Sequence, residues 1–136
     1  MAALTADRRT AARDGGSYSY PVAASVTCYA GAGAVLDAAG NLKPAVTGTG
    51  LVTVGIFPQR VVNAGSAGAV EAEVRPGVYR FANSASADEI TAAEIGDDCY
   101  WVDDQTVAKT AGTSTRSVAG KVTDVDDIGV WVKLGI

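Results

Sequence analysis

The sequence contains no histidine, the side chain that most often acts as general acid, general base or metal ligand. A Ser-His-Asp triad is therefore excluded. Cysteine is scarce too, because Cys28 and Cys99 are the only two in 136 residues. Two cysteines are too few for a disulfide framework, and their apolar flanks predict buried strand positions where cysteine acts as a small hydrophobic residue. A Cys28–Cys99 bridge is the less favoured alternative.

Long apolar runs and basic clusters are also missing. The N-terminus lacks the apolar segment of a secretory signal, and no apolar stretch approaches the length of a transmembrane helix. The net charge is −4, and an acidic chain binds nucleic-acid phosphates poorly. These absences predict a soluble protein made in the cytosol, with neither a membrane nor a nucleic acid among its partners.

What the sequence does contain is a succession of short β-prone segments. The pattern is clearest between Ala69 and Phe81, where apolar and charged residues alternate, pause at Pro76-Gly77 and resume. Alternation with a period of two places the apolar side chains on one face of a strand. The pattern predicts an all-β fold in which residues 21–136 form one small β-barrel domain. Further strands are expected at 22–29, 34–37, 42–44, 51–57, 99–102, 106–108, 117–125 and 130–134.

One short helix is expected between Ser84 and Gly96. Ser86 is its expected N-cap, and Thr91 and Glu94 have the spacing of a capping box. Only about one or two turns fit before the glycine, a residue that commonly ends helices. The segment is therefore predicted to connect strands.

A weak internal repeat runs through the chain. In each copy a strand ends in aspartate, turns, returns, loops out and re-enters through a strand that contains glycine. Leu36 and Gly55 are 19 positions apart, and the corresponding Val102 and Gly120 are 18 apart. Two interpretations are open: related β-units on two sides of one barrel, or chance similarity in a chain rich in Gly, Ala and Val.

Three acidic pairs are the strongest candidates for chemistry: Asp97-Asp98, Asp103-Asp104 and Asp126-Asp127. Each pair lies at a predicted turn, where aspartate is favoured because its side chain bonds the nearby backbone. None has the spacing of an EF-hand loop, and the Gly-rich segments lack the lysine and following helix of a phosphate loop. We therefore expect turns, with no metal site, no cofactor and no enzymatic activity.

Residues 1–20 are predicted to form an extended N-terminal arm. Residues 1–19 carry a net charge of +1 against −5 for the rest of the chain, and Gly15-Gly16 resembles a hinge. The segment is either a frayed terminus or an arm that orders on a partner, with arginines meeting carboxylates there. In the second interpretation the candidate contact residues are Leu4, Arg8, Arg9, Arg13, Tyr18 and Tyr20.

Trp101 and Trp131 each lie in an apolar strand. Such residues most often belong to the core. The alternative is a subunit interface, where tryptophan is enriched. Both are therefore candidate interface residues.

The chain from about Gly50 onward resembles the capsid cement, or head decoration, proteins of tailed phages. Those proteins share a progression of β-strands and glycines rather than a catalytic signature. Residues that carry the resemblance are Glu71–Val74, Gly77–Phe81, Ile90, Ile95-Gly96, Cys99–Asp103, Val107, Ala119–Val122 and Val130–Leu134, with Leu51–Gly55 similar to the preceding strand. The arginine-bearing segment before Tyr18 has no counterpart in the family pattern.

The resemblance implies a small β-barrel or β-tulip protein that binds the major capsid protein on the outside of the head. It also implies a homotrimer that stabilises capsomer junctions after assembly in the bacterial cytoplasm. Two alternatives stay open from the sequence. One is a tail-tube or baseplate subunit, and the other is a small ligand-binding β-barrel.

Overall fold

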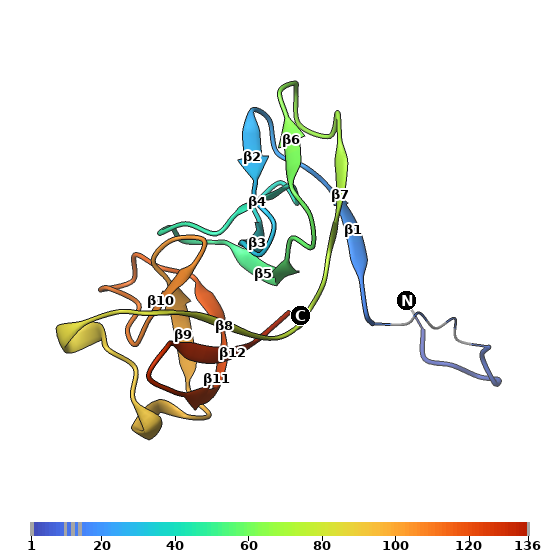
Figure 1. The fold of residues 1–136 in the computed structure, drawn as a ribbon. Coiled ribbons are helices and arrows are strands. Elements are labelled where there is room, and N and C mark those ends of the chain that lie inside the picture. Colours follow the sequence, from blue (N-terminus) through green and yellow to red (C-terminus); the bar gives the residue numbers. More distant parts are fainter. Residues whose placement is uncertain (1, 10, 12, 14, 136) are drawn as a thin grey trace.

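The computed structural model describes residues 2–9, 11, 13 and 15–135, and it confirms the all-β class. Figure 1 shows strands gathered into two lobes, with the N-terminal segment extending away from them. The strands are β1 (Tyr18–Pro21), β2 (Val26–Cys28), β3 (Gly33–Leu36), β4 (Leu42–Pro44), β5 (Val52–Ile56), β6 (Val61–Asn63), β7 (Glu71–Val74), β8 (Gly77–Asn83), β9 (Asp98–Trp101), β10 (Thr106–Ala108), β11 (Val118–Val125) and β12 (Val130–Leu134).

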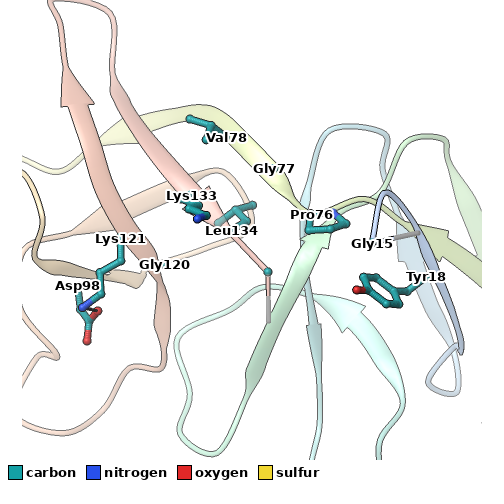
Figure 2. A pocket seen from close by; sticks show the side chains of 11 residues that line it. Gly15, Tyr18, Pro76, Gly77, Val78, Asp98, Gly120, Lys121, Lys133 and Leu134 are labelled. Carbon is teal, nitrogen blue, oxygen red and sulfur yellow. Dashed lines mark ion pairs between the residues drawn. The ribbon is translucent and has the colours of Figure 1, made fainter. Parts of the chain in front are cut away.

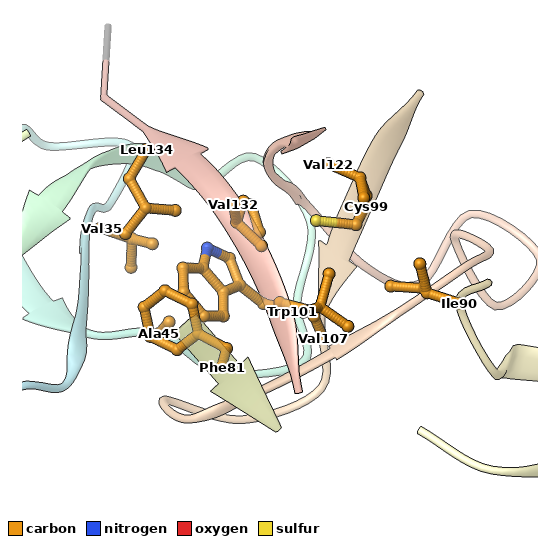
Figure 3. Packing of buried hydrophobic residues seen from close by; sticks show 12 residues of the cluster. Val35, Ala45, Phe81, Ile90, Cys99, Trp101, Val107, Val122, Val132 and Leu134 are labelled. Atoms are coloured by element: carbon orange, nitrogen blue, oxygen red, sulfur yellow. The ribbon is translucent and has the colours of Figure 1, made fainter. Parts of the chain in front are cut away.

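The C-terminal lobe is a closed barrel with strand order β10-β8-β12-β11-β9, in which β9 pairs back to β10. Strands β8 and β10 are parallel, and the other neighbours are antiparallel. Trp101 fills its interior and meets Phe81 edge to face, with ring centres 5.1 Å apart (Figure 3). The expected closed barrel is confirmed, but it uses only strands after Pro76, whereas we expected one barrel over residues 21–136.

The N-terminal lobe has its own core and three small sheets, β4-β3-β5, β1-β7 and β2-β6. Two isolated bridges connect these sheets. Val22 pairs in parallel with Leu42, and Ile56 pairs antiparallel with Arg75. The Ile56–Arg75 bridge joins β5 to the end of β7, and the Val22–Leu42 bridge joins the end of β1 to β4. The strand order is therefore β4-β3-β5-β7-β1, and it closes on β4. The first lobe is thus a second ring of five strands, joined at two places by single residue pairs.

The two rings have the same topology. Strands β1, β3, β4, β5 and β7 pair in the same order and directions as β8, β9, β10, β11 and β12. Gly55 and Gly120 occupy equivalent places, and a Cβ on either would overlap a backbone carbonyl, that of Arg75 or of Lys133. The internal repeat is therefore structural, and it builds two barrels rather than two sides of one.

The expected helix is present only as two separate 3-10 turns, Ser86–Asp88 and Ala92–Glu94. The capping box is confirmed, because the Thr91 N–H donates to Glu94 Oε1 at 2.9 Å and the Ala93 N–H to Thr91 Oγ1 at 3.3 Å. Ser86 is not the N-cap of the first turn. Extended backbone at Glu89 and Ile95 ends both turns before an α-helix can form.

The two lobes meet along β5 and β11 and at the residues that immediately precede these strands. The Leu51 N–H donates to Ser117 Oγ at 3.1 Å, and the Thr53 hydroxyl donates to the Val118 carbonyl at 2.8 Å. Val35 and Ala45 of the first lobe join the core of the second (Figure 3). The lobes therefore share apolar burial as well as hydrogen bonds.

Candidate interaction surfaces

The described part of the arm is exposed throughout. Every described residue between 2 and 17 lies on the surface, including Arg8, Arg9 and Arg13, and Leu4 is 72% exposed. No strand or helix is present in the described residues of this segment. Figure 1 shows it leading away from both lobes. Four of the predicted contact residues are thus placed where a partner can reach them.

Tyr18 and Tyr20 belong to the body rather than to the arm. They lie in β1, opposite Val74 and Ala72 of β7, and their rings stack with centres 6.3 Å apart. Both pack against the core of the first lobe and are half-buried. The arm predicted to comprise residues 1–20 therefore ends before Tyr18, because strand pairing begins there.

The two tryptophans have different surroundings. Trp101 is 0% exposed, so it belongs to the core of its own chain and has no surface to offer a second copy. Trp131 lies half-buried on β12, where its Nε1 donates to Asp126 Oδ2 at 2.9 Å and Arg80 Cζ stands 5.7 Å from a ring centre. Of the two predicted interface residues, only Trp131 is accessible.

Charge divides sharply along the chain. Residues 18–76 carry three cations and three carboxylates, whereas residues 77–136 carry five cations and ten carboxylates. The whole −5 charge of the body therefore belongs to the C-terminal barrel and its flanks. The positively charged arm is attached to the neutral first lobe, and the negative charge lies in the second lobe. The net charge therefore changes sign from the N-terminal arm to the C-terminal barrel.

Two grooves lie at opposite ends of the barrel strands. The first, of about 770 Å³, is here named the lysine groove; Tyr18, Pro76, Val78, Lys121, Lys133 and Leu134 are among its lining residues (Figure 2). Lys121 Nζ is 2.7 Å from Asp98 Oδ1, and this hydrogen bond raises the pKa of Lys121. Within the described residues Lys133 forms no ion pair.

The second groove, of about 690 Å³, is here named the carboxylate groove. Glu89, Asp126, Asp127 and Ile128 line it, and its described lining includes no cation. Asp126 Oδ1 accepts the N–H groups of Ile128 and Gly129 at 2.8 and 2.9 Å. The Trp131 hydrogen bond and these backbone bonds lower the pKa of Asp126. The carboxylate therefore holds the β11–β12 turn, as the acidic-pair pattern predicts.

The other two acidic pairs also have structural roles, but the predicted turn at Asp97-Asp98 is only partly present, because Asp98 is the first residue of β9 and pairs in register with Lys121 of β11. Asp103 Oδ1 accepts the Gln105 N–H at 2.9 Å, and Asp98 pairs with Lys121. Among the described residues there is no group of three or more His, Cys, Asp or Glu side chains placed to hold a metal ion. Turn formation accounts for Asp103 and Asp126.

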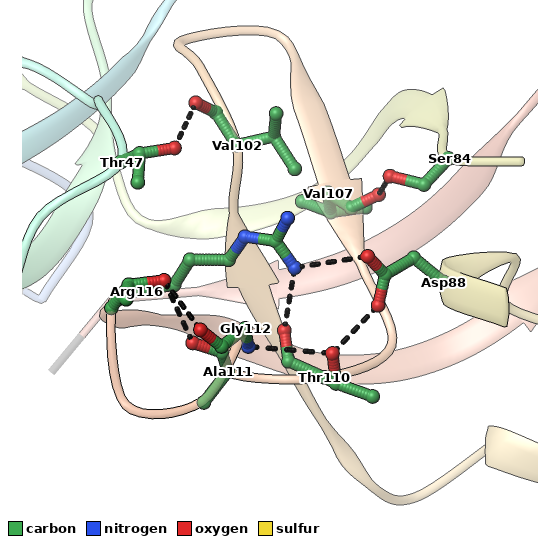
Figure 4. A network of polar contacts seen from close by, with 10 residues as sticks. Thr47, Ser84, Asp88, Val102, Val107, Thr110, Ala111, Gly112 and Arg116 are labelled. Carbon is green, nitrogen blue, oxygen red and sulfur yellow. Dashed lines mark hydrogen bonds and ion pairs between the residues drawn. The ribbon is translucent and has the colours of Figure 1, made fainter.

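Sequence reasoning missed a polar network around Asp88 (Figure 4). Asp88 accepts the Thr110 hydroxyl at 2.6 Å and Arg116 Nη1 at 3.2 Å, and the same Nη1 also donates to the Thr110 carbonyl. The Thr110 bond, followed by Arg116, lowers the pKa of Asp88. This network ties the loop after β10 to the first 3-10 turn. These residues are 22 and 28 positions apart, so no local pattern signals the contact.

Both cysteines are buried and free, and they lie in the cores of different lobes. The Cys28–Cys99 bridge is therefore absent, and the predicted apolar role is confirmed. Burial raises the pKa of Cys28 to about 11 and that of Cys99 to about 12. Neither thiol is poised to react at neutral pH.

No helix among the described residues is both long and apolar enough to cross a membrane. Comparison of the chain with protein-family models, curated proteins and solved structures finds no match.

Proposed function

We propose that this protein is a capsid decoration protein that binds the outer surface of a tailed-phage head and stabilises capsomer junctions. Its partner is the major capsid protein, and its working form is a homo-oligomer, a trimer by the resemblance. The observation that carries the proposal is a packed all-β body with an exposed arginine-bearing arm. A packed body that sits on one subunit, together with a segment that extends to the next, lets one chain contact neighbouring subunits.

The resemblance to cement proteins supports the proposal because most of its residues form the framework of the second barrel, while Leu51–Gly55 and Glu71–Val74 belong to the β5 and β7 region of the first lobe. Phe81, Trp101, Val107, Val122 and Val132 are interior positions, and Gly120 is a close-approach position. The shared progression therefore matches strands that must pack together. It leaves outside the resemblance both the arm and the strands that precede Gly50.

The energetics limit how the arm binds. Ordering its backbone costs about 1–2 kcal/mol per residue, whereas an exposed ion pair returns about 0–1 kcal/mol. Arg8, Arg9 and Arg13 alone therefore do not hold it on a capsid. Burial of Leu4, which is 72% exposed, or pairing of the arm with a partner's strand edge supplies the missing stabilisation.

A ligand-binding barrel is less well supported. Trp101 and Phe81 fill the closed barrel with side chains, so its interior offers no room for a small molecule. A tail-tube or baseplate subunit needs a long insertion for stacking rings. The segment between β8 and β9 instead folds into two short turns, and Ile90 is buried in the barrel core.

Binding to expanded, undecorated heads tests the proposal. Purified full-length protein, a variant that lacks residues 2–16, and a variant with Arg8, Arg9 and Arg13 changed to Ala are each incubated with heads and sedimented. We expect saturable binding of the full-length protein, weaker binding of the arginine variant and the weakest binding after truncation. If the full-length protein does not bind, the proposed capsid-decoration function is wrong. If all three proteins bind equally, the function stands but the arm does not contribute to binding.

A further inference from the structure

The two grooves lie at opposite ends of the same three strands, β8, β11 and β12. Strand β8 begins in the lysine groove at Gly77 and ends in the carboxylate groove at Asn83, while β12 runs back and ends at Leu134. Seven residues of strand extend roughly 20 Å, so one copy cannot bring its two grooves together. A contact between them requires a second copy.

The β11–β12 turn lies at the carboxylate end and is held by hydrogen bonds of Asp126. Asp126 fixes the turn through two backbone N–H groups and the Trp131 ring nitrogen. Ile128 is nevertheless 71% exposed. Asp127 is also exposed and forms no ion pair within the described residues. The turn therefore presents an apolar side chain and a free carboxylate in a preorganised arrangement, which lowers the entropy cost of binding.

The lysine groove has the complementary chemistry. Val78, 49% exposed, lines it together with the half-buried Pro76, and four glycines at 15, 77, 120 and 135 leave it open (Figure 2). Asp98 already neutralises Lys121, and Asp97 also acts on that lysine. Lys133 is therefore the cation that remains for a partner.

We propose that the lysine groove binds the β11–β12 turn of a second copy of this chain. Ile128 inserts against Val78 and Pro76 of the neighbour, and Asp127 pairs with Lys133. The chain's own arm contributes Gly15 to the lining, but its further insertion fits less well, because Arg8, Arg9 and Arg13 would approach the lysines as like charges. The contact joins unlike surfaces, so repeating it closes a ring or extends a filament. It rests on the homo-oligomer of the proposed function and supplies that oligomer with a specific interface.

Disulfide trapping between copies tests the contact without capsids. Full-length Asp127→Cys and Lys133→Cys proteins, carrying different tags, are mixed under oxidising conditions at about 1 mM, a concentration that populates even weak complexes. Cys28 and Cys99 are buried and do not compete. We expect a cross-linked species that contains both tags and forms only in the mixture. No cross-link in the mixture, or equal cross-linking of either variant alone, overturns the contact.

Charge reversal gives a second, independent readout by sedimentation. Lys133→Glu and Asp127→Lys are each expected to weaken association about tenfold, and the double variant is expected to recover most of it. Lys109→Glu is the matched control, because Lys109 is an exposed lysine outside both grooves. Unchanged association in both single variants contradicts the proposal. Both assays use the protein without heads. They can therefore fail while capsid binding succeeds, or succeed while capsid binding fails, so the two proposals are tested separately.

Discussion

Trp101 Nε1 donates a 2.8 Å hydrogen bond to the hydroxyl of Thr53, a residue 48 positions earlier in the other lobe. The same hydroxyl donates to the Val118 carbonyl at 2.8 Å. One threonine side chain therefore satisfies a donor in the core of the second barrel and an acceptor on its β11 strand. The boundary between the two related barrels is closed by this specific polar link as well as by apolar packing.

Removal of the link is expected to destabilise the whole chain. Thr53→Val keeps the shape of the side chain but leaves the buried indole N–H without its acceptor, at a cost of about 1–3 kcal/mol. The free energy of unfolding is measured by urea titration. Thr49→Val is the matched control, because Thr49 is exposed. Equal stability of the two variants would show that the hydrogen bond contributes nothing.

Gly33 lies directly beneath the Trp101 ring, where a Cβ would overlap the ring atoms. Gly33→Ala is therefore expected to lose about 1–3 kcal/mol through overpacking, with a change in Trp fluorescence. Gly48→Ala introduces the same methyl where the nearest atom is Leu51 Cδ1 at 3.5 Å, an ordinary contact. A loss of the same size in both variants would contradict close packing at Gly33.

Stability is expected to depend on pH through Asp88. Its folded-state pKa is lowered from 3.8 by Thr110 and Arg116, so its contribution is present above the ordinary pKa and is lost as pH falls through the lowered value. Asp88→Asn should be less stable than the native chain at pH 7 and approach it at the acid end of the range. Asp7→Asn is the control, because Asp7 is exposed and lies outside both grooves. If the free energy of unfolding of Asp88→Asn differs from that of the native chain by the same amount at every pH, the ionised form of Asp88 does not provide the stabilisation.

The two thiols are expected to be inaccessible in the folded chain. Burial raises the pKa of each, so thiolate is rare at pH 8, and a disulfide reagent has no path to the sulfur. We expect slow labelling in buffer and rapid labelling of both cysteines in denaturant. Fast labelling of Cys28 without denaturant would show that the first ring, closed at single residue pairs, opens on its own.

Local patterns predicted local structure well. Alternation around Glu71–Val74 correctly placed β7, and the aspartate pairs correctly marked the turns at Asp103 and Asp126. The strand β6 was missed because three residues between turn formers carry too little pattern. The buried Asn63, whose amide donates to three backbone carbonyls, was also missed, since polar residues are expected outside.

The division into two barrels could not be predicted, because it depends on pairing between distant strands. The parallel contact of Ala82 with Thr106 and the bridge from Val22 to Leu42 close the two rings, and neither leaves a spacing signal. Composition separated the N-terminal segment from the body, and its described residues before Tyr18 are exposed, but the predicted bound at residue 20 was wrong because Tyr18 and Tyr20 pair in β1. The lysine and carboxylate grooves are assembled from distant strand ends, so the sequence order conceals them.

The central claim is most directly tested by electron cryomicroscopy of expanded heads that have been incubated with the full-length protein. The account predicts density on the outer surface at capsomer junctions, with both lobes resolved and the arm extended along a neighbouring subunit. Undecorated heads after incubation at saturating protein, or density confined to the tail of intact virions, would contradict it.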